Sequence, residues 1–350
     1  MALAVNTDLA SILAEVFDEQ ITSQINRSVV ALKVVPHEYA SGQALVYDAE
    51  TSNVSQTTPT LADGADVSAY EDVTITKAKL DFGTYSLAFG VSGKAMAAAR
   101  SSNSPKELLD LMLVNLKVSA QKQAKSLNKD FYLGAGGNAM LGVLATAGGF
   151  RAAGTYATIV RGTVTSWAGN EIANGGTPRA LTIALMHTAL NAAYTACGEF
   201  PNVILMHPDT FVKYGNLLRV ANSYMEFDNV NIDGRIISID GGYTALRFCG
   251  IPVLADPDCP NHTVIFMNTN YVSIAQMADG ATADNRGTGL ITLAGSPEKR
   301  TGMGGTALTS RINPLSMTGD KAKLQLLCYP QVKVTRPNAH AILTDIDPAL

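Results

Sequence analysis

One long helix constrains the architecture of this chain more than any other feature of its sequence. Ser104-Pro105-Lys106-Glu107 combines an N-cap serine, a proline at the first helical position and a glutamate three residues after the cap. Apolar residues then hold one face at three- and four-residue spacing as far as Phe131, and Gly134 is a suitable stop. At a rise of 1.5 Å per residue such a helix is about 43 Å long, which predicts a rigid strut.

A projecting β-hairpin is predicted ahead of this helix. Residues 43–48 and 73–82 have the composition of strands, and residues 85–91 alternate as a third. A long stretch rich in Thr, Ser, Ala and Asn separates the first two strands. A loop of that length without its own core is usually functional or supported by a partner. We therefore expect an extended hairpin that leaves the body of the protein.

The loop of this hairpin is acidic. Residues 48–72 contain no Lys or Arg, whereas their acids are Asp48, Glu50, Asp63, Asp66, Glu71 and Asp72. Residues 48–72 form either an ordinary solvated loop or an acidic finger that docks on a basic surface of a neighbouring copy. Lysines on one face of the long helix would supply that surface. The candidate inter-subunit contacts are Asp63, Asp66, Lys122, Lys125 and Lys129.

The rest of the chain mixes helices with short strands. Residues 8–30 read as one amphipathic helix or two short ones, an arm that must find its partner elsewhere. A Gly/Ala-rich link follows the long helix at residues 134–149, and further helices are predicted at 177–198 and 210–219. Strands are predicted at 202–206, 236–239, 251–255, 263–267, 271–275, 323–328 and 331–335. This mixture indicates an α+β fold.

Composition narrows the classes of partner. Of the 350 residues only 16% are charged, against roughly 25% in typical soluble domains, so much of the surface is neutral and easier to bury against another protein. The net charge is −4 and no Lys/Arg cluster is present, which argues against sequence-specific nucleic-acid binding. No apolar run is long enough for a membrane helix, and we expect no signal peptide. The scattered cysteines are expected to be free thiols in a reducing cytoplasm.

Motifs of catalysis are missing from the sequence. It contains no nucleophile elbow, Walker loop, Rossmann fingerprint or zincin pair, so we expect no enzyme activity and no cofactor. Residues 302–306 are Gly-rich but read as a flexible loop. Asp256, Asp258, Cys259 and His262 are close enough in sequence to suggest a metal site, yet the prolines between them favour a turn. We therefore predict no metal site, and expect Trp167 to pack in a core.

The order of these elements resembles the major capsid proteins of tailed bacteriophages, the Hong Kong 97-type fold. Three local stretches support the resemblance. Phe200 to Phe211 is similar to the family's strand that ends at a proline and opens a helix, and Phe248 to Val253 resembles its Gly-Ile-Pro-Val strand. The last β pair, ending in Pro337 to Leu343, resembles the family's C-terminal close.

The resemblance implies an α+β Hong Kong 97-like fold divided into named parts. These would be an N-terminal arm at 1–35, an extended β-hairpin loop with its flanking strand at 36–100, a peripheral domain with the spine helix at 101–176, an axial domain at 177–280, and a return to the peripheral domain at 281–350. It implies an icosahedral shell of hexamers and pentamers that encloses double-stranded DNA without gripping it. The short arm suggests a separate scaffolding protein, and a portal protein is a further expected partner. Whether a decoration protein is added stays open on the sequence.

The same resemblance places the protein in the virion, assembled in the cytoplasm of a bacterial host, with no membrane contact. Two other classes stay open on the sequence. An encapsulin-type compartment shares the fold but encloses cargo enzymes, and a phage tail or receptor-binding β-protein would lack the long helix. A hydrolase with an unrecognised site is a further alternative, which the missing motifs disfavour.

Overall fold

The computed structural model describes most of the chain outside the N-terminal arm. The described residues are 29–51, 63, 74–94, 97, 105–220, 226–227, 229–232, 235–238, 245–277, 290–294, 308–315, 321–347 and 349–350. The predicted arm helix therefore lies outside the described residues except for residues 29 and 30, and so do Ser104, Asp66 and the loop at 302–306.

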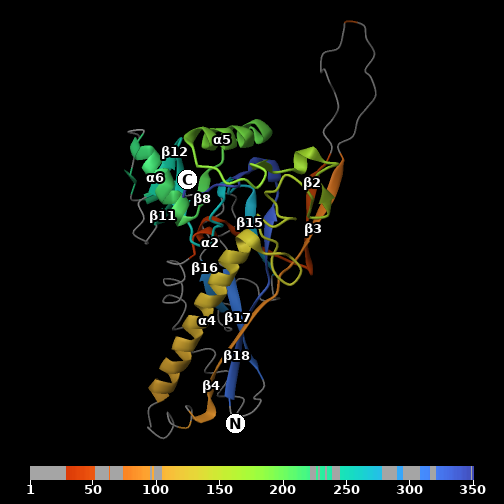
Figure 1. Ribbon diagram of the computed structural model, residues 1–350. Coiled ribbons are helices and arrows are strands. Elements are labelled where there is room, and N and C mark those ends of the chain that lie inside the picture. Colours follow the sequence, from red (N-terminus) through yellow and green to blue (C-terminus); the bar gives the residue numbers. More distant parts are fainter. Residues whose placement is uncertain are drawn as a thin grey trace.

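The predicted strut is helix α4, Pro105–Leu133, with 29 residues. Its end is confirmed, since the N–H of Gly134 donates to the carbonyl of Asp130 at 2.8 Å. Figure 1 shows α4 running beside a sheet of long antiparallel strands, and α4 contacts β4 of that sheet. The strand order is β16 (Leu290–Ala294), β17 (Leu308–Leu315), β18 (Lys321–Cys328) and β4 (Tyr85–Ser92). The strand predicted at 85–91 thus pairs with a strand near the C-terminus.

A seven-stranded sheet forms the centre of the other half. Its order is β7 (Asn170–Ile172), β20 (Ala341–Leu343), β14 (Val264–Met267), β8 (Val203–Met206), β13 (Ile251–Ala255), β12 (Ala245–Phe248) and β9 (Glu226–Phe227). Successive side chains of a strand point to opposite faces, so Val203 and Leu205 join one core while Ile204 and Met206 join another. Helices α5 (Ile183–Cys197) and α6 (Pro208–Val220) pack on the second of these cores.

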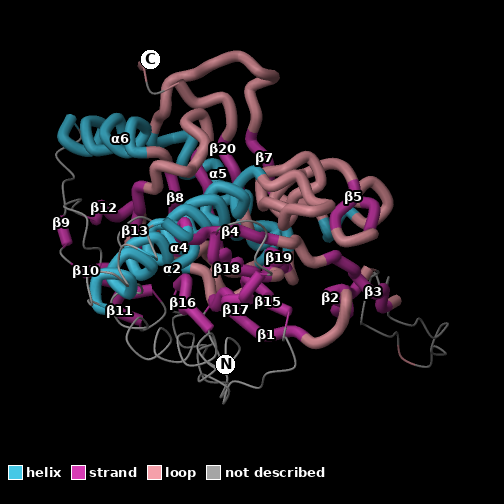
Figure 2. The backbone as a smooth tube through the Cα atoms, turned by 90° about the horizontal axis from the view of Figure 1, so that it is seen from below, coloured by secondary structure: helices cyan, strands magenta, loops and turns pink. Residues whose placement is uncertain are grey.

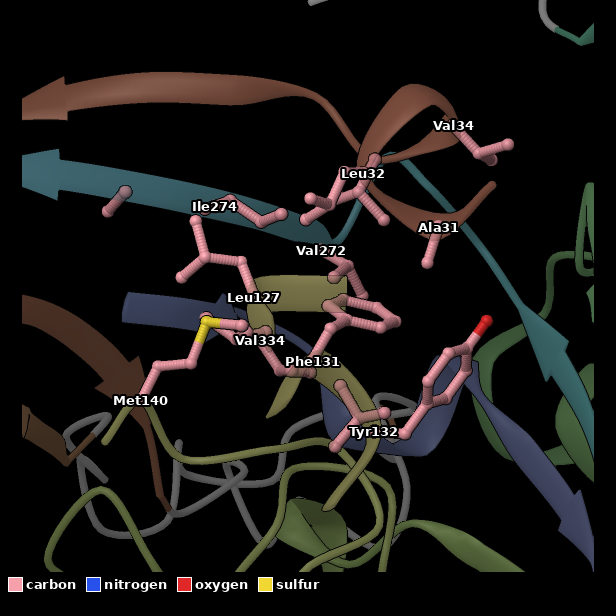
Figure 3. Close-up of a cluster of buried hydrophobic side chains, with 14 of the residues drawn as sticks. Ala31, Leu32, Val34, Leu127, Phe131, Tyr132, Met140, Val272, Ile274 and Val334 are labelled. Carbon is pink, nitrogen blue, oxygen red and sulfur yellow. The ribbon is translucent and has the colours of Figure 1, made fainter. Parts of the chain in front are cut away.

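The first core lies where the start of the described chain meets α4. Figure 3 shows Leu32 of α2 (Ala31–Val34) close to Leu127 and Phe131 of α4 and to Ile274 of β15. All four side chains are fully buried. Full burial of each contributes roughly 1.5–3 kcal/mol. Strands β1 (His37–Ala40), β15 (Val272–Met277) and β19 (Pro330–Val334) form the small sheet over this core.

Short elements complete the described structure. The strands of the predicted hairpin are β2 (Ala44–Glu50) and β3 (Ile75–Asp81), and β5 (Thr155–Tyr156) pairs with β6 (Ile159–Val160). Strands β10 (Asn229–Ile232) and β11 (Arg235–Ser238) form a separate ladder. Two 3-10 turns lie at Thr165–Trp167 and Pro337–Ala339.

Two sequence predictions are corrected by the structure. The helix expected from residue 177 begins instead after Thr182, whose hydroxyl accepts from the N–H of Leu185 at 3.2 Å. Residues before Thr182 are held extended, because Arg179 forms a β-bridge with Ile346 near the C-terminus. The strands that were not predicted are β1, β5, β6, β7, β9, β10, β12, β16, β17 and β20. The partner of β7 is β20, which is distant in sequence, whereas β16 and β17 pair with each other and β17 pairs with the next strand, β18.

Candidate functional site

The β2–β3 hairpin is the first place where contact with another copy was expected. Its strands pair antiparallel, so side chains alternate between a face toward the body and a face toward solvent. On the outer face Val46 is 51% exposed and Ile75 is 65% exposed. Figure 1 shows β2 and β3 side by side at one edge of the molecule. The inner face is buried through Leu45, Ala49, Ala78 and Leu80.

The structure places the acids of the finger in two settings. Asp48 lies within β2 directly opposite Lys77 of β3, and Glu50 is the last residue of β2. Asp63 is a turn residue of the loop that joins the strands, whereas Asp66 lies outside the described residues. Asp48 therefore has a lysine opposite it in the stem, whereas Glu50 is opposite Ile75. The loop sequence contains Asp63, Asp66, Glu71 and Asp72 and no Lys or Arg.

The predicted basic face of α4 is present. Lys122, Lys125 and Lys129 are all exposed on one side of the helix. The opposite side is buried through Leu116, Ala120, Ala124, Leu127 and Phe131. Lys122 also borders a small cleft between α4 and β4 that Tyr85, Ser86 and Ser126 help to line. The lysine face is thus a solvent-facing cationic stripe on a rigid element.

The described part of one subunit does not bring acids of the hairpin and lysines of α4 together. In Figures 1 and 2 the β2–β3 hairpin lies at the edge of the molecule, away from α4. Among the residues that the structure describes, no ion pair joins Lys122, Lys125 or Lys129 to an acid. A contact between the two sets would therefore have to form between copies.

The structure contains a buried polar junction that was not predicted from the sequence. Asp256, at the end of β13, is 0% exposed and accepts hydrogen bonds from three segments of the chain. Asn128 Nδ2 donates to both of its oxygens at 3.1 Å, and the hydroxyl of Tyr132 donates to Oδ2 at 2.8 Å. The N–H of Ala31 donates to the same oxygen at 3.1 Å. One carboxylate thus connects α2, α4 and the turn after β13.

The chemistry of this junction is structural. Burial raises the pKa of Asp256, while hydrogen bonds from the N–H of Asp258, from Tyr132 and from Asn128 oppose the shift. Asn128 is also fully buried, on a mainly apolar face of α4 where Ser119 and Gln123 are buried as well. A polar residue inside an apolar stripe must be hydrogen-bonded, and this signal in the sequence could have identified the junction.

The four residues that were close enough in sequence to suggest a metal site have other partners in the structure. Asp258 accepts from Asn128 at 2.7 Å, and Nδ1 of His262 contacts the carbonyl of Ile346 at 2.8 Å. Cys259 is buried, and burial raises the pKa of its thiol well above the usual range. Within the described ranges no group of three His, Cys, Asp or Glu residues could hold a metal ion. The turn interpretation of this segment is the one the hydrogen bonds support.

Other residues singled out in the sequence have packing roles. Trp167 is 4% exposed, as expected for a core residue. Cys197 is buried, and burial raises the pKa of its thiol. His207 pairs through Nδ1 with Asp209 at 3.3 Å at the start of α6. In the part of the chain that the structure describes, no helix is both long and apolar enough to cross a membrane.

Comparison with solved structures identifies the fold. The chain is similar to the protein of the Cyanophage A-1(L) capsid asymmetric unit, at 22% identity and a TM-score of 0.65 over 90% of this chain and 92% of that chain. It is similar to the native GTA particle capsid at 14% identity and a TM-score of 0.52, over 93% and 89% of the two chains. At such identities the likeness shows a shared fold, and it confirms the Hong Kong 97-type α+β architecture.

The encapsulin alternative shares this fold but has less support. The SrpI encapsulin of Synechococcus elongatus PCC 7942 matches at 10% identity and a TM-score of 0.54, over 90% of this chain and 86% of that chain. The receptor-binding β-protein alternative required that no long helix be present, and α4 contradicts it. No curated protein matches the sequence significantly.

A comparison with protein families assigns this chain to a family as well as to a fold. The model of the SU10 major capsid protein family matches residues 32–289, well over half of the chain. The matched range includes the β2–β3 hairpin, α4, both described helices that follow it and most of the seven-stranded sheet. This protein therefore belongs to the SU10 major capsid protein family, and it is a structural capsid subunit that assembles with copies of itself rather than an enzyme.

Proposed function

We propose that the shell closes through contact between the acidic finger of one subunit and the lysine face of α4 on a neighbour. The observation that supports the proposal is the exposure of Lys122, Lys125 and Lys129 along one side of a rigid helix. Asp63 and Asp66 in the hairpin loop are the complementary charges. Opposite charges on two surfaces steer association and fix its register, and like charges in the same places oppose it.

The division of the subunit into domains is a second part of the proposal. We infer an N-terminal arm at 1–35, an extended loop at 36–100, a peripheral domain at 101–176 completed by 281–350, and an axial domain at 177–280. Helices α5 and α6 and the strands β8, β9, β12, β13 and β14 support the axial assignment, because they lie within 177–280 and contribute most of one core. Strands β7 and β20 of the same sheet lie in the ranges inferred for the peripheral domain. The axial domains would meet at the centres of hexamers and pentamers.

The remaining partners are inferred from the role of a shell subunit. A separate scaffolding protein would guide assembly in the bacterial cytoplasm, a portal protein would occupy one vertex, and a decoration protein would bind the outer surface. The shell would enclose double-stranded DNA without sequence-specific contacts, which agrees with a net charge of −4. Purified particles that contain DNA rather than cargo enzymes would separate this function from that of an encapsulin.

Charge reversal tests the inter-subunit contact. The Asp63→Lys/Asp66→Lys variant and the Lys125→Glu/Lys129→Glu variant should each place like charges together, at a cost of roughly 0.5–1 kcal/mol per reversed pair. Both should reduce the yield of closed shells in electron micrographs while the circular dichroism spectrum of the subunit is retained. The fourfold variant restores opposite charges and should recover assembly.

Two controls make this experiment decisive. Lys213→Glu on α6 changes the same charge on a different element and should leave the yield of shells unchanged. Assembly of the native protein should also weaken with added salt, because the Debye length is about 8 Å at physiological ionic strength. Normal shells from both double variants, or no recovery in the fourfold variant, would refute the contact.

A further inference from the structure

An aromatic cluster lies at the base of the β2–β3 hairpin. Tyr47 of β2 has its ring centroid 6.4 Å from that of Trp167, and Tyr156 of β5 lies 6.1 Å from Trp167 on the same measure. Trp167 is 4% exposed and Tyr156 is 1% exposed. Tyr47 of the hairpin therefore meets Tyr156 and Trp167, two residues of a segment that is more than one hundred positions away in the sequence.

The polar atoms of the cluster attach it to one residue of β19. The hydroxyl of Tyr47 donates to the carbonyl of Val334 at 3.0 Å, and the N–H of Val334 donates to the hydroxyl of Tyr156 at 2.8 Å. Nε1 of Trp167 donates to the carbonyl of Tyr156 at 3.2 Å. Rings packed together with their polar atoms bonded hold one another in a single orientation.

A cation lies over each of the two tyrosine rings. Lys333 Nζ is 5.5 Å from the centroid of Tyr47 and donates to Glu38 Oε1 at 2.9 Å. The Arg161 guanidinium is 5.5 Å from the centroid of Tyr156. Arg161 is 2% exposed and donates to the carbonyl of Ala153 at 2.7 Å. Burial lowers the pKa of Arg161 to about 10, so it stays charged at neutral pH. Such cation–π contacts gain strength when they are shielded from water.

The second strand of the hairpin has its own attachment. The N–H of Lys79 in β3 donates to the carbonyl of Ala157 at 3.0 Å. Ala157 and Thr158 form the tight turn between β5 and β6, with φ of 51° and 71°. β2 is thus held through Tyr47 and β3 through Lys79. Attachment at both strands restricts rotation of the hairpin as well as its position.

We propose that Tyr47, Tyr156, Trp167 and Lys333 form an aromatic clamp that fixes the direction in which the hairpin leaves the body. These are positioning residues for assembly, and the inference rests on the capsid function but not on where the finger docks. Glu50, the last residue of β2, is three residues beyond Tyr47, about 10 Å at 3.3 Å per residue, so a rotation of about 10° at the clamp displaces that end of the strand by about 2 Å. Such a displacement exceeds the tolerance of a specific interface.

Trp167 makes the angle measurable, because it is the single tryptophan of the chain. Ile75→Cys in a Cys249→Ser background provides one exposed thiol on the hairpin for a dansyl acceptor, since the other three cysteines are buried. Time-resolved energy transfer from Trp167 then reports the distribution of distances between body and hairpin in the free subunit. The same variants without the label are assembled and examined by electron microscopy.

Three substitutions test separate parts of the aromatic clamp. Tyr47→Leu removes the ring and should widen the distance distribution at least about twofold and reduce closed shells about tenfold. Tyr47→Phe keeps the ring and should stay close to the native protein. Lys333→Met removes the cation over Tyr47 and should widen the distribution less. Arg151→Met is the matched control, because it breaks another partly buried ion pair, to Glu171, that involves no residue of β2 or β3.

The outcomes separate the clamp from the charge contact. Native distances and native shells from Tyr47→Leu would overturn the clamp. If Tyr47→Leu does not fold, Lys333→Met decides, and a distribution equal to that of Arg151→Met would overturn it. Failure of the finger and lysine reversals to affect assembly would refute the charge contact while leaving the result for the clamp intact.

Discussion

Asp256 shows how a single buried carboxylate can organise a subunit. A charge taken out of water is tolerated only where hydrogen bonds replace its hydration, and Asp256 receives them from Asn128, Tyr132 and Ala31. These donors belong to α4 and α2, while Asp256 follows β13 of the seven-stranded sheet. The junction therefore specifies how these segments meet, which apolar packing alone would leave less defined.

His340 predicts that the protein loses stability in acid. It is fully buried and stacked on Phe150 at 4.2 Å, its Nδ1 accepts from the N–H of Asn268, and burial lowers its pKa to about 3. The unfolded chain, with a pKa near 6.5, then binds more protons at every pH between these values. The contribution of His340 to the free energy of unfolding is therefore present above about pH 6.5 and decreases toward pH 3. At pH 5 the loss relative to pH 7 is roughly 2 kcal/mol.

Denaturant titrations between pH 7 and 5 measure this loss. Burial also lowers the pKa of His37 to about 4, so its contribution has the same sign. The raised pKa of Asp256 has the opposite effect: its contribution to stability is present at low pH and is lost as the pH rises through the pKa of the folded state. His340→Asn should reduce the slope of the free energy of unfolding against pH by the amount that corresponds to about one bound proton. An unchanged slope would show that His340 is not the responsible group.

At the scale of elements, the end of α4 depends on how closely two backbones approach. A Cβ on Gly134 would lie 2.1 Å from the carbonyl oxygen of Met140, so no side chain fits there without movement of the backbone. Gly134→Ala should destabilise the subunit by about 2–4 kcal/mol, seen as a lower thermal midpoint. Gly162→Ala is the control, because its Cβ would meet nothing within 4 Å. Equal midpoints in the two variants would contradict this account of the helix end.

At the scale of the whole molecule, the two cores share one sheet. β8 contributes Val203 and Leu205 to the core that contains α4, and Ile204 and Met206 to the core under α5 and α6. A strand buried on both faces cannot leave one core without opening the other. The two halves should therefore unfold together, although each has its own helices.

Ile204→Ala tests this coupling. The substitution opens a cavity in the core under α5 and α6 and should cost about 2–5 kcal/mol. Trp167 lies in the other core, so its fluorescence should report the same lowered midpoint as far-UV circular dichroism. Val212→Ala on the exposed side of α6 should leave the midpoint close to that of the native protein. A native midpoint for Trp167 in Ile204→Ala would show that the cores unfold separately.

Local patterns in the sequence determined the elements whose signals are contained within a few residues. The capping residues and apolar stripe predicted α4 to within a residue, and alternation predicted β2, β3 and β4. The same reading placed Lys122, Lys125 and Lys129 on one exposed face. Helical and strand periods depend only on backbone geometry, so residue spacing reveals them before any tertiary contact forms.

Which distant segments of the chain meet became known from the folded structure alone. The pairing of β4 with β18, the junction at Asp256 and the cluster of Tyr47, Tyr156 and Trp167 all join residues far apart in the chain. The start of α5 moved to Thr182 for the same reason, since Arg179 is held by Ile346. Such contacts gain their free energy from burial and hydrogen bonding in the folded core, which local propensity does not encode.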